Sequence, residues 1–167
     1  MPPLIVRIKK KTDGSAALSC VRPDGTTTWQ RQQGQQGAFF PWHDLTHYAV
    51  EGALGYDRAF FGLVAAGWDL GDFGTPWPRG PLPDQALDAE LLVGFLDAER
   101  AGGVRWTAED FRSKTAAYYG QRGIPRSGAQ LSDADLARIR ADRGRLFERW
   151  RALPAGETLE LSFPTEA

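Results

Sequence analysis

The sequence predicts an α+β fold, in which an N-terminal antiparallel β-meander and a C-terminal strand pack against a bundle of about five helices. Residues 4–31 alternate β-prone runs with turn signals, as a meander does. Residues 41–152 carry apolar side chains at helical spacing, and residues 157–163 return to strand alternation. The simplest arrangement adds that last strand to the meander. A chain of 167 residues is long enough to bury its own core, so we expect one domain over 1–167.

The N-terminal strands are separated by two glycine-containing turns. Residues 4–8 have high β-propensity, and Asp13-Gly14 marks the first turn. Residues 16–22 resume the extended run. The turn at 23–25 then leads to the β-branched and aromatic run at 26–31. These three segments form the predicted meander.

Three helices are predicted in the middle of the chain. The first covers about 41–55, with a proline in its first turn and a glycine at its end. Residues 57–66 are apolar nearly all round, which is typical of a short buried helix. The stretch 67–83 is rich in glycine, proline and tryptophan and predicts a long ordered loop, whose aromatic residues either form a lid over the site or cover the core. A third helix follows at 84–102.

The fourth and fifth helices have the clearest start signals in the chain. Thr107 precedes Asp110 by three residues, and Ser132 precedes Asp135 by the same distance. Each pair is the pattern of a capping box. The fifth helix is expected to end before the Pro-Ala-Gly sequence at 154–156.

The composition is that of an ordinary globular protein, with 42% apolar and 25% charged residues. No apolar run is long enough to span a bilayer, and the N-terminus lacks the features of a signal peptide. A single cysteine, Cys20, cannot form an internal disulfide, so we expect a cytoplasmic protein without membrane association. Cys20 is expected to be a small buried hydrophobe in its strand.

The two histidines of the chain, His43 and His47, lie four residues apart in the first predicted helix. Residues at this spacing share one face of a helix, so both imidazoles can bind one metal ion. Asp44 and Glu51 fall on the same polar face. The surrounding block 41–99 has ten acidic and two basic residues, a balance that suits a cation better than a phosphate.

This pattern predicts a divalent metal site for zinc, iron or manganese, with His43 and His47 as ligands. Glu51 is the candidate third ligand. Asp69 and Asp72, in the following loop, are equally plausible additional ligands. Two histidines and one carboxylate with open positions suit a catalytic zinc or non-haem iron better than a closed structural zinc site.

Asp44 occupies the position that the glutamate has in H-E-x-x-H, where the acid is the general base on metal-bound water. This favours metal-dependent hydrolysis of a small molecule, with Asp44 as the catalytic residue. Asp44 can equally orient an imidazole or cap the helix. The whole polar face can equally be solvated or form a structural hydrogen-bond network, so the sequence does not decide whether the protein is an enzyme.

The alternative function is a non-enzymatic interaction protein that binds a protein or nucleic-acid partner through a sheet edge or the last helix. That helix carries six arginines: Arg138, Arg140, Arg143, Arg145, Arg149 and Arg151. Acidic residues stand between them at spacings of three or four, which favours a solvated, ion-paired face over a nucleic-acid surface.

The block F-F-P-W-H-D-L-T-H-Y-A-V-E at 39–51, continuing through 59–70, resembles one shared by a family of uncharacterised bacterial proteins. The resemblance covers about a fifth of the chain and implies a bacterial protein, but it brings no known activity. H-D-x-x-H is also similar to the motif of a coenzyme Q biosynthesis protein. That pattern expects a glutamate twelve residues after the second histidine, where this chain has Ala59, so its activity is not carried over.

Overall fold

The computed structural model describes residues 2–32, 34 and 36–165. The predicted domain 1–167 therefore includes five residues outside the described ones: Met1, Gln33, Gln35, Glu166 and Ala167. In the described part, three strands are followed by five α-helices and a closing strand. The predicted α+β class and the order of its elements are confirmed.

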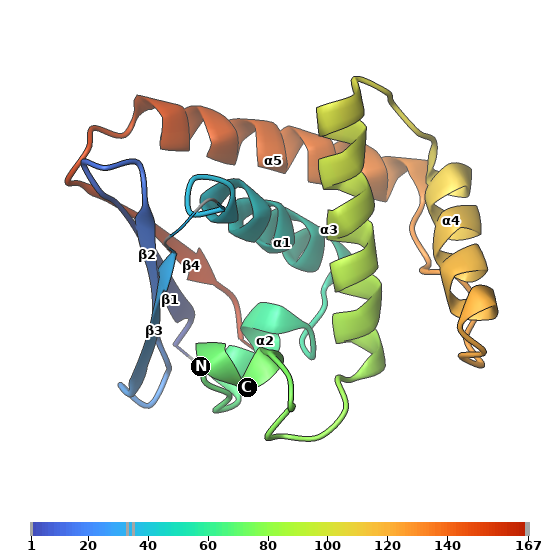
Figure 1. Cartoon of the computed structure of the whole chain (residues 1–167), viewed down its shortest axis with the longest axis horizontal. Helices are drawn as coiled ribbons and strands as arrows, with labels where there is room; N and C mark the ends of the chain where they lie inside the picture. Colours follow the sequence, from blue (N-terminus) through green and yellow to red (C-terminus); the bar gives the residue numbers. More distant parts are fainter. Residues whose placement is uncertain (1, 33, 35, 166–167) are drawn as a thin grey trace.

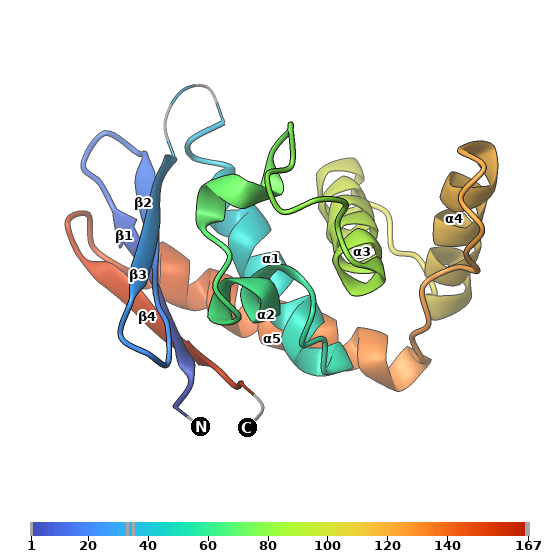
Figure 2. The same cartoon turned by 90° about the horizontal axis from the view of Figure 1, so that it is seen from below.

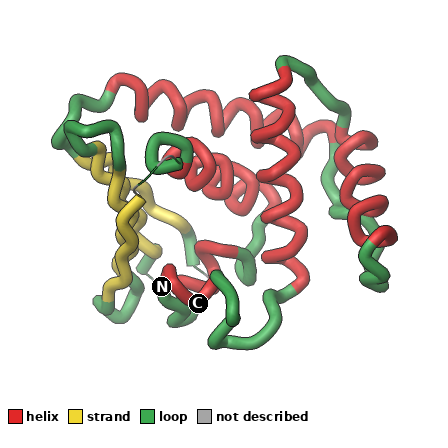
Figure 3. The backbone as a smooth tube through the Cα atoms, in the orientation of Figure 1, coloured by secondary structure: helices red, strands yellow, loops and turns green. Residues whose placement is uncertain are grey.

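The four strands form one antiparallel sheet in the order β3-β2-β1-β4. Its strands are β1 (Leu4–Lys10), β2 (Ala16–Val21), β3 (Thr27–Gln32) and β4 (Thr158–Phe163). The C-terminal strand joins the N-terminal meander, as predicted, and there it pairs with β1. The sheet lies at one side of the molecule, and the helices cover a single face of it (Figure 1, Figure 3).

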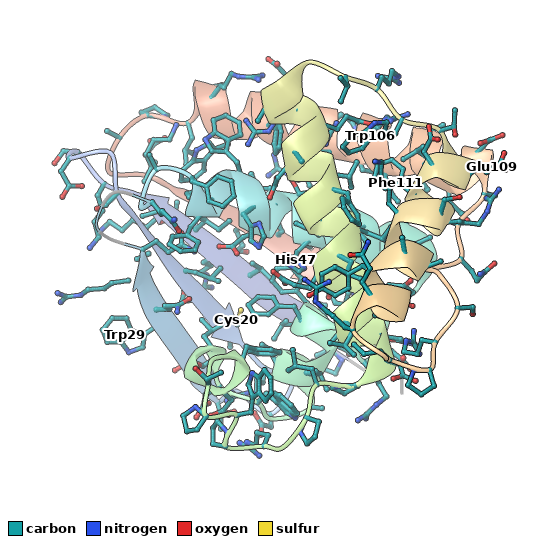
Figure 4. The ribbon with its side chains drawn as sticks, turned by 45° about the vertical axis from the view of Figure 1, so that its right-hand side comes forward. Cys20, Trp29, His47, Trp106, Glu109 and Phe111 are labelled. Carbon is teal, nitrogen blue, oxygen red and sulfur yellow. The ribbon has the colours of Figure 1, made fainter. Side chains whose placement is uncertain are left out.

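Apolar and polar side chains alternate along the strands, which explains why the helices cover only one face of the sheet. The inward side chains of the central and edge strands are almost fully buried: Leu4, Val6, Ile8, Leu159, Leu161 and Phe163. On the outer face, Arg7 and Glu160 form an ion pair of 2.9 Å in solvent. Trp29 also points outward from the sheet, away from the helices (Figure 4). An antiparallel sheet with one apolar face can stand against a core on one side and water on the other.

The helices begin and end largely where their capping residues predict. They are α1 (Phe40–Leu54), α2 (Phe60–Ala65), α3 (Asp84–Gly102), α4 (Ala108–Gln121) and α5 (Asp133–Ala152). Gly55 ends α1 in the left-handed conformation, with φ of 66°, which glycine adopts without a steric penalty. The capping boxes of Thr107 and Ser132 are both formed.

The second helix is shorter than predicted. Residues 57–59 form bends, and α2 begins only after Ala59. The backbone N–H of Arg58 donates to the side chain of Gln85 at the start of α3. The residues next to Arg58 in the sequence do not predict this contact, because Gln85 belongs to another helix. The long loop 67–83 contains a short 3₁₀ helix, η1 (Leu70–Phe73).

Helix α1 lies between two hydrophobic clusters. Leu45 and Ala49 pack with the sheet and α5, whereas Val50 belongs to a second cluster with residues of α3 and α4 such as Leu92 and Phe111. Figure 2 shows α1 between the sheet and α3. Because both sides of α1 are covered, the polar side chains on it are withdrawn from bulk water.

Cys20 lies in the buried face of the sheet, as expected of a small hydrophobe. Burial raises the pKa of its thiol to about 12, which keeps it neutral and unreactive at physiological pH. Among the described residues, none of the helices combines the length and hydrophobicity needed to cross a bilayer.

Candidate metal centre

The two histidines of α1 project toward α3. Their ring centroids lie 4.8 Å apart, His47 is almost fully buried, and His43 retains 19% of its side-chain exposure. Figure 4 places His47 in the middle of the molecule. Across from the histidines, α3 contributes two carboxylates that the sequence pattern did not single out, Glu90 and Asp97.

Each imidazole is held through its Nδ1 atom by a carboxylate of its own. Nδ1 of His43 lies 2.8 Å from Oδ2 of Asp97, and Nδ1 of His47 lies 2.9 Å from Oε2 of Glu51. A ring N–H that donates to a carboxylate leaves the Nε2 lone pair free. This is the outer-shell arrangement found around histidines that bind metals.

Both Nε2 atoms turn toward one shared carboxylate. Nε2 of His47 lies 3.0 Å from Oε2 of Glu90, and Nε2 of His43 lies 3.6 Å from Oε1 of Glu90. Ligand atoms at zinc bond lengths on a tetrahedral ion are roughly 3.3 Å apart, so these separations fit around a single ion. The group His43, His47 and Glu90 could hold a metal ion, since one ligand atom from each lies within 4.8 Å of the others.

The same network holds protons when no metal is present. Burial lowers the pKa of both imidazoles, but the hydrogen bonds that the rings donate to Asp97, Glu51 and Glu90 outweigh it. They raise the pKa of His43 to about 9 and that of His47 to about 10. Burial alone would raise the pKa of Glu90. The hydrogen bonds that its carboxylate accepts from the two histidines outweigh burial and hold that pKa well below the usual range. A metal ion would therefore take the place of a proton on each Nε2.

Asp44 lies beside this group on α1 and is 7% exposed. The side-chain amide of Gln32, at the end of β3, donates a hydrogen bond to it. Burial raises the pKa of Asp44 to about 6, although the bond from Gln32 and the two nearby histidines act in the opposite direction. The carboxylate is thus held in place from the sheet and lines the same pocket as the histidines.

A pocket of about 420 Å³ opens next to the candidate ligands. Besides the polar residues already described, it is lined by apolar and aromatic side chains from α1, α2 and the loop 67–83. These include Phe40, Phe60, Leu70, Phe73, Trp77 and Leu82. The loop therefore forms a wall of the pocket.

The structure places the other candidate ligands away from the Nε2 atoms. Asp69 pairs with Arg22 at 2.7 Å, and Asp72 pairs with Arg79 at 3.0 Å. The two aspartates also form the capping box of η1. Their carboxylates serve to fix the loop that walls the pocket.

Glu51 lies behind His47, on the side opposite Glu90. It is fully buried, and both of its oxygens are engaged. Oε2 accepts from His47, and Oε1 accepts from the backbone N–H of Phe61 at 2.9 Å. In this position Glu51 orients the imidazole, while Glu90 is the carboxylate that faces the ligand atoms.

Sequence reasoning missed Glu90 and Asp97 although a signal for them exists. The two acids are seven residues apart in a helix, which puts them on one face two turns apart. They also lie in the acidic block that contains the histidines. Nothing in the local pattern says that this face of α3 packs against α1.

Comparison with protein-family models, with curated proteins and with solved structures finds no match for this chain.

Proposed function

We propose that the protein binds a divalent metal ion through His43, His47 and Glu90 and uses it to hydrolyse a small molecule in the adjoining pocket. One observation carries this proposal. Both Nε2 atoms converge on one carboxylate, while each Nδ1 is held by a different carboxylate. This arrangement puts three ligand atoms of the kinds that bind divalent metals within 4.8 Å of one another, beside a pocket.

The ligand types favour zinc, iron or manganese. Two imidazole nitrogens and one carboxylate oxygen suit all three, and three protein ligands leave a position open for water. Glu90, whose side chain is 60% exposed, lies on the pocket side of the histidines. A closed structural site has four protein ligands, so the three found among the described residues support a catalytic use.

A bound divalent ion would acidify a coordinated water and polarise a carbonyl group of the substrate. Asp44 lines the same pocket and in this proposal would take the proton as the water oxygen bonds to the carbonyl carbon. When the tetrahedral adduct collapses, the bond from that carbon to the leaving nitrogen or oxygen breaks. The proton held by Asp44 then passes to the leaving atom, which completes a hydrolysis without any other reactant.

Metal content tests the binding half of the proposal. We expect near-stoichiometric zinc, iron or manganese in the purified untagged protein by elemental analysis, and its loss on chelation. His43→Ala/His47→Ala and Glu90→Gln should lose most of it. Asp72→Asn should retain it, because Asp72 lies in η1 and pairs with Arg79. Unchanged metal in the histidine double variant would refute the assignment.

Asp44→Asn tests the catalytic half. We expect this variant to bind the metal as the wild type does, because the histidines and Glu90 are intact. Its hydrolysis of activated ester and anilide substrates should fall by about 100-fold or more, as loss of a general base does. Wild-type rates in the metal-loaded variant would remove Asp44 from the mechanism.

The alternative, a non-enzymatic interaction protein, has weaker support. Arg138 and Arg145 both pair with Asp142, and Arg151 pairs with Glu148. These contacts along α5 are those of an ion-paired, solvated face.

A further inference from the structure

We infer that the pocket beside the metal centre recognises an organic cation, so that the substrate carries an ammonium or guanidinium group on an apolar body. The inference rests on the proposed function in one respect, which is that this pocket is where the substrate lies. Three features of the pocket carry it: its aromatic walls, its excess of carboxylates and the conformation of Trp77.

Aromatic rings surround the space next to the ligands. Phe60 lies 5.6 Å from the ring of His47 and 4.6 Å from the ring of Phe73, so the aromatic wall is continuous with the metal centre. Phe40 and Trp77 add two more rings to the lining. The faces of such rings attract organic cations, and several rings around one space form the cage that binds quaternary ammonium groups.

The charges at the site also favour a cation. Asp44 and Glu90 line the pocket, and Asp97 and Glu51 stand directly behind the histidines. Each imidazole has a carboxylate of its own behind it, so a proton on either ring is balanced within that pair. Among the described residues that line the pocket, none is a lysine or an arginine. An ammonium group in the pocket would therefore meet Asp44 and Glu90 without competition from a basic side chain of the described lining.

Trp77 is held in an unfavourable backbone conformation at the pocket wall. Its φ of 55° is the single positive value at a non-glycine position in the described chain. Bulky side chains rarely adopt this left-handed region, and such strain gathers at ligand-binding positions. The indole is nevertheless 45% exposed, so the conformation presents the ring to the pocket and to solvent instead of burying it in the core.

A matched pair of probes separates charge from shape. Choline and 3,3-dimethylbutan-1-ol have nearly the same size and differ in the positive charge. In NMR titrations of the zinc-loaded protein, we expect choline to bind about tenfold more tightly than the alcohol. The anion 3,3-dimethylbutanoate, titrated into the chelated protein so that no metal ion can bind its carboxylate, should bind more weakly than either. Equal affinity for choline and the alcohol, or preference for the anion, would overturn the inference.

Trp77→Gly locates the site within the molecule. Glycine suits the backbone at this position, so the variant is expected to fold, and it should lose choline affinity by about tenfold. The control is Trp29→Ala, which removes another exposed indole from the outer face of the sheet. It should bind choline as the wild type does. If the two variants behave alike, the assignment of the cation to this pocket fails.

The outcomes for the two proposals are distinguishable. A protein that takes up no metal but prefers choline in a Trp77-dependent way keeps the cation site and loses the metal-dependent hydrolysis. A protein that holds metal through His43, His47 and Glu90 but shows no preference for choline keeps the metal centre and loses the cation site.

Discussion

At the scale of single residues, the candidate centre depends on the different contacts of the two nitrogens in each imidazole: Nδ1 contacts a carboxylate behind the ring, and Nε2 faces Glu90. Nδ1 of His43 and of His47 contacts a carboxylate behind the ring, which fixes the tautomer and the direction in which Nε2 points. The sequence identified both histidines and the adjacent Asp44. It did not settle the role of Glu51, because the spacing i, i+4 suits a shared ligand and a carboxylate that orients the ring equally well.

Asp97→Asn tests whether the carboxylate behind His43 supports metal binding. We expect zinc affinity to fall by about 10- to 100-fold, since a neutral amide polarises the imidazole less than a carboxylate does. The measurement is a competition titration with a chromogenic chelator.

Asp88→Asn is the matched control for that variant. Asp88 lies on the same helix with similar exposure, 13% against 11% for Asp97, but it pairs with Arg126. Its zinc affinity should equal that of the wild type even if the fold loses stability. A similar loss of affinity in both variants would mean that α3 as a whole, and not the contact with His43, supports the site.

At the scale of elements, the capping and turn residues predicted most of the boundaries. The helix starts at Thr107 and Ser132 and the end of α1 at Gly55 follow from local hydrogen bonds and backbone conformation, which depend on neighbouring residues. The start of α2 could not be predicted in this way. It depends on the contact of Arg58 with Gln85, a residue of another helix.

Gly62→Ala should strongly disturb α2. A Cβ at this position would lie 2.0 Å from the carbonyl oxygen of Asp57, so the bends at 57–59 would have to move. The N–H of Phe61, which holds Glu51, lies next to the substitution. We expect a loss of about 1–3 kcal/mol in the free energy of unfolding, measured with urea.

Gly94→Ala supplies the opposite expectation in the same experiment. Gly94 lies in α3, and a Cβ added there would meet no neighbouring atom within 4 Å. Alanine there should stabilise the protein by about 0.5–1 kcal/mol through helix propensity. If the Gly62→Ala protein has the same free energy of unfolding as the wild type, the bends at 57–59 can move to admit the Cβ without loss of stability, and the expectation is wrong.

At the scale of the whole molecule, the return of the last strand to the sheet was predicted, because an amphipathic strand must cover its apolar face. The pairing of α1 with α3 was not. It joins two hydrophobic clusters through packing that no short pattern describes, and Glu90 and Asp97 reach the histidines only by that pairing.

A metal ion shared by His43, His47 and Glu90 would link α1 to α3 and thereby the two clusters. Because the unfolded chain does not hold these ligands together, binding should stabilise the folded state by about 2.7 kcal/mol when free metal is 100 times the Kd. We expect a higher Tm by calorimetry on adding zinc, reversed by chelation. In Glu90→Gln the same addition should produce little shift; a full shift would place the stabilising ion elsewhere.

The pairing of β4 with β1 also bears on how the polypeptide folds during synthesis. Of the elements in the sheet, β1 leaves the ribosome first and β4 last, with all of the helices between them. Until β4 emerges, one edge of β1 stays unpaired, and the cluster that receives Leu159, Leu161 and Phe163 stays open. An open edge beside an apolar surface invites association with other nascent chains. The interval before the last strand emerges is therefore when this protein most needs protection by a chaperone.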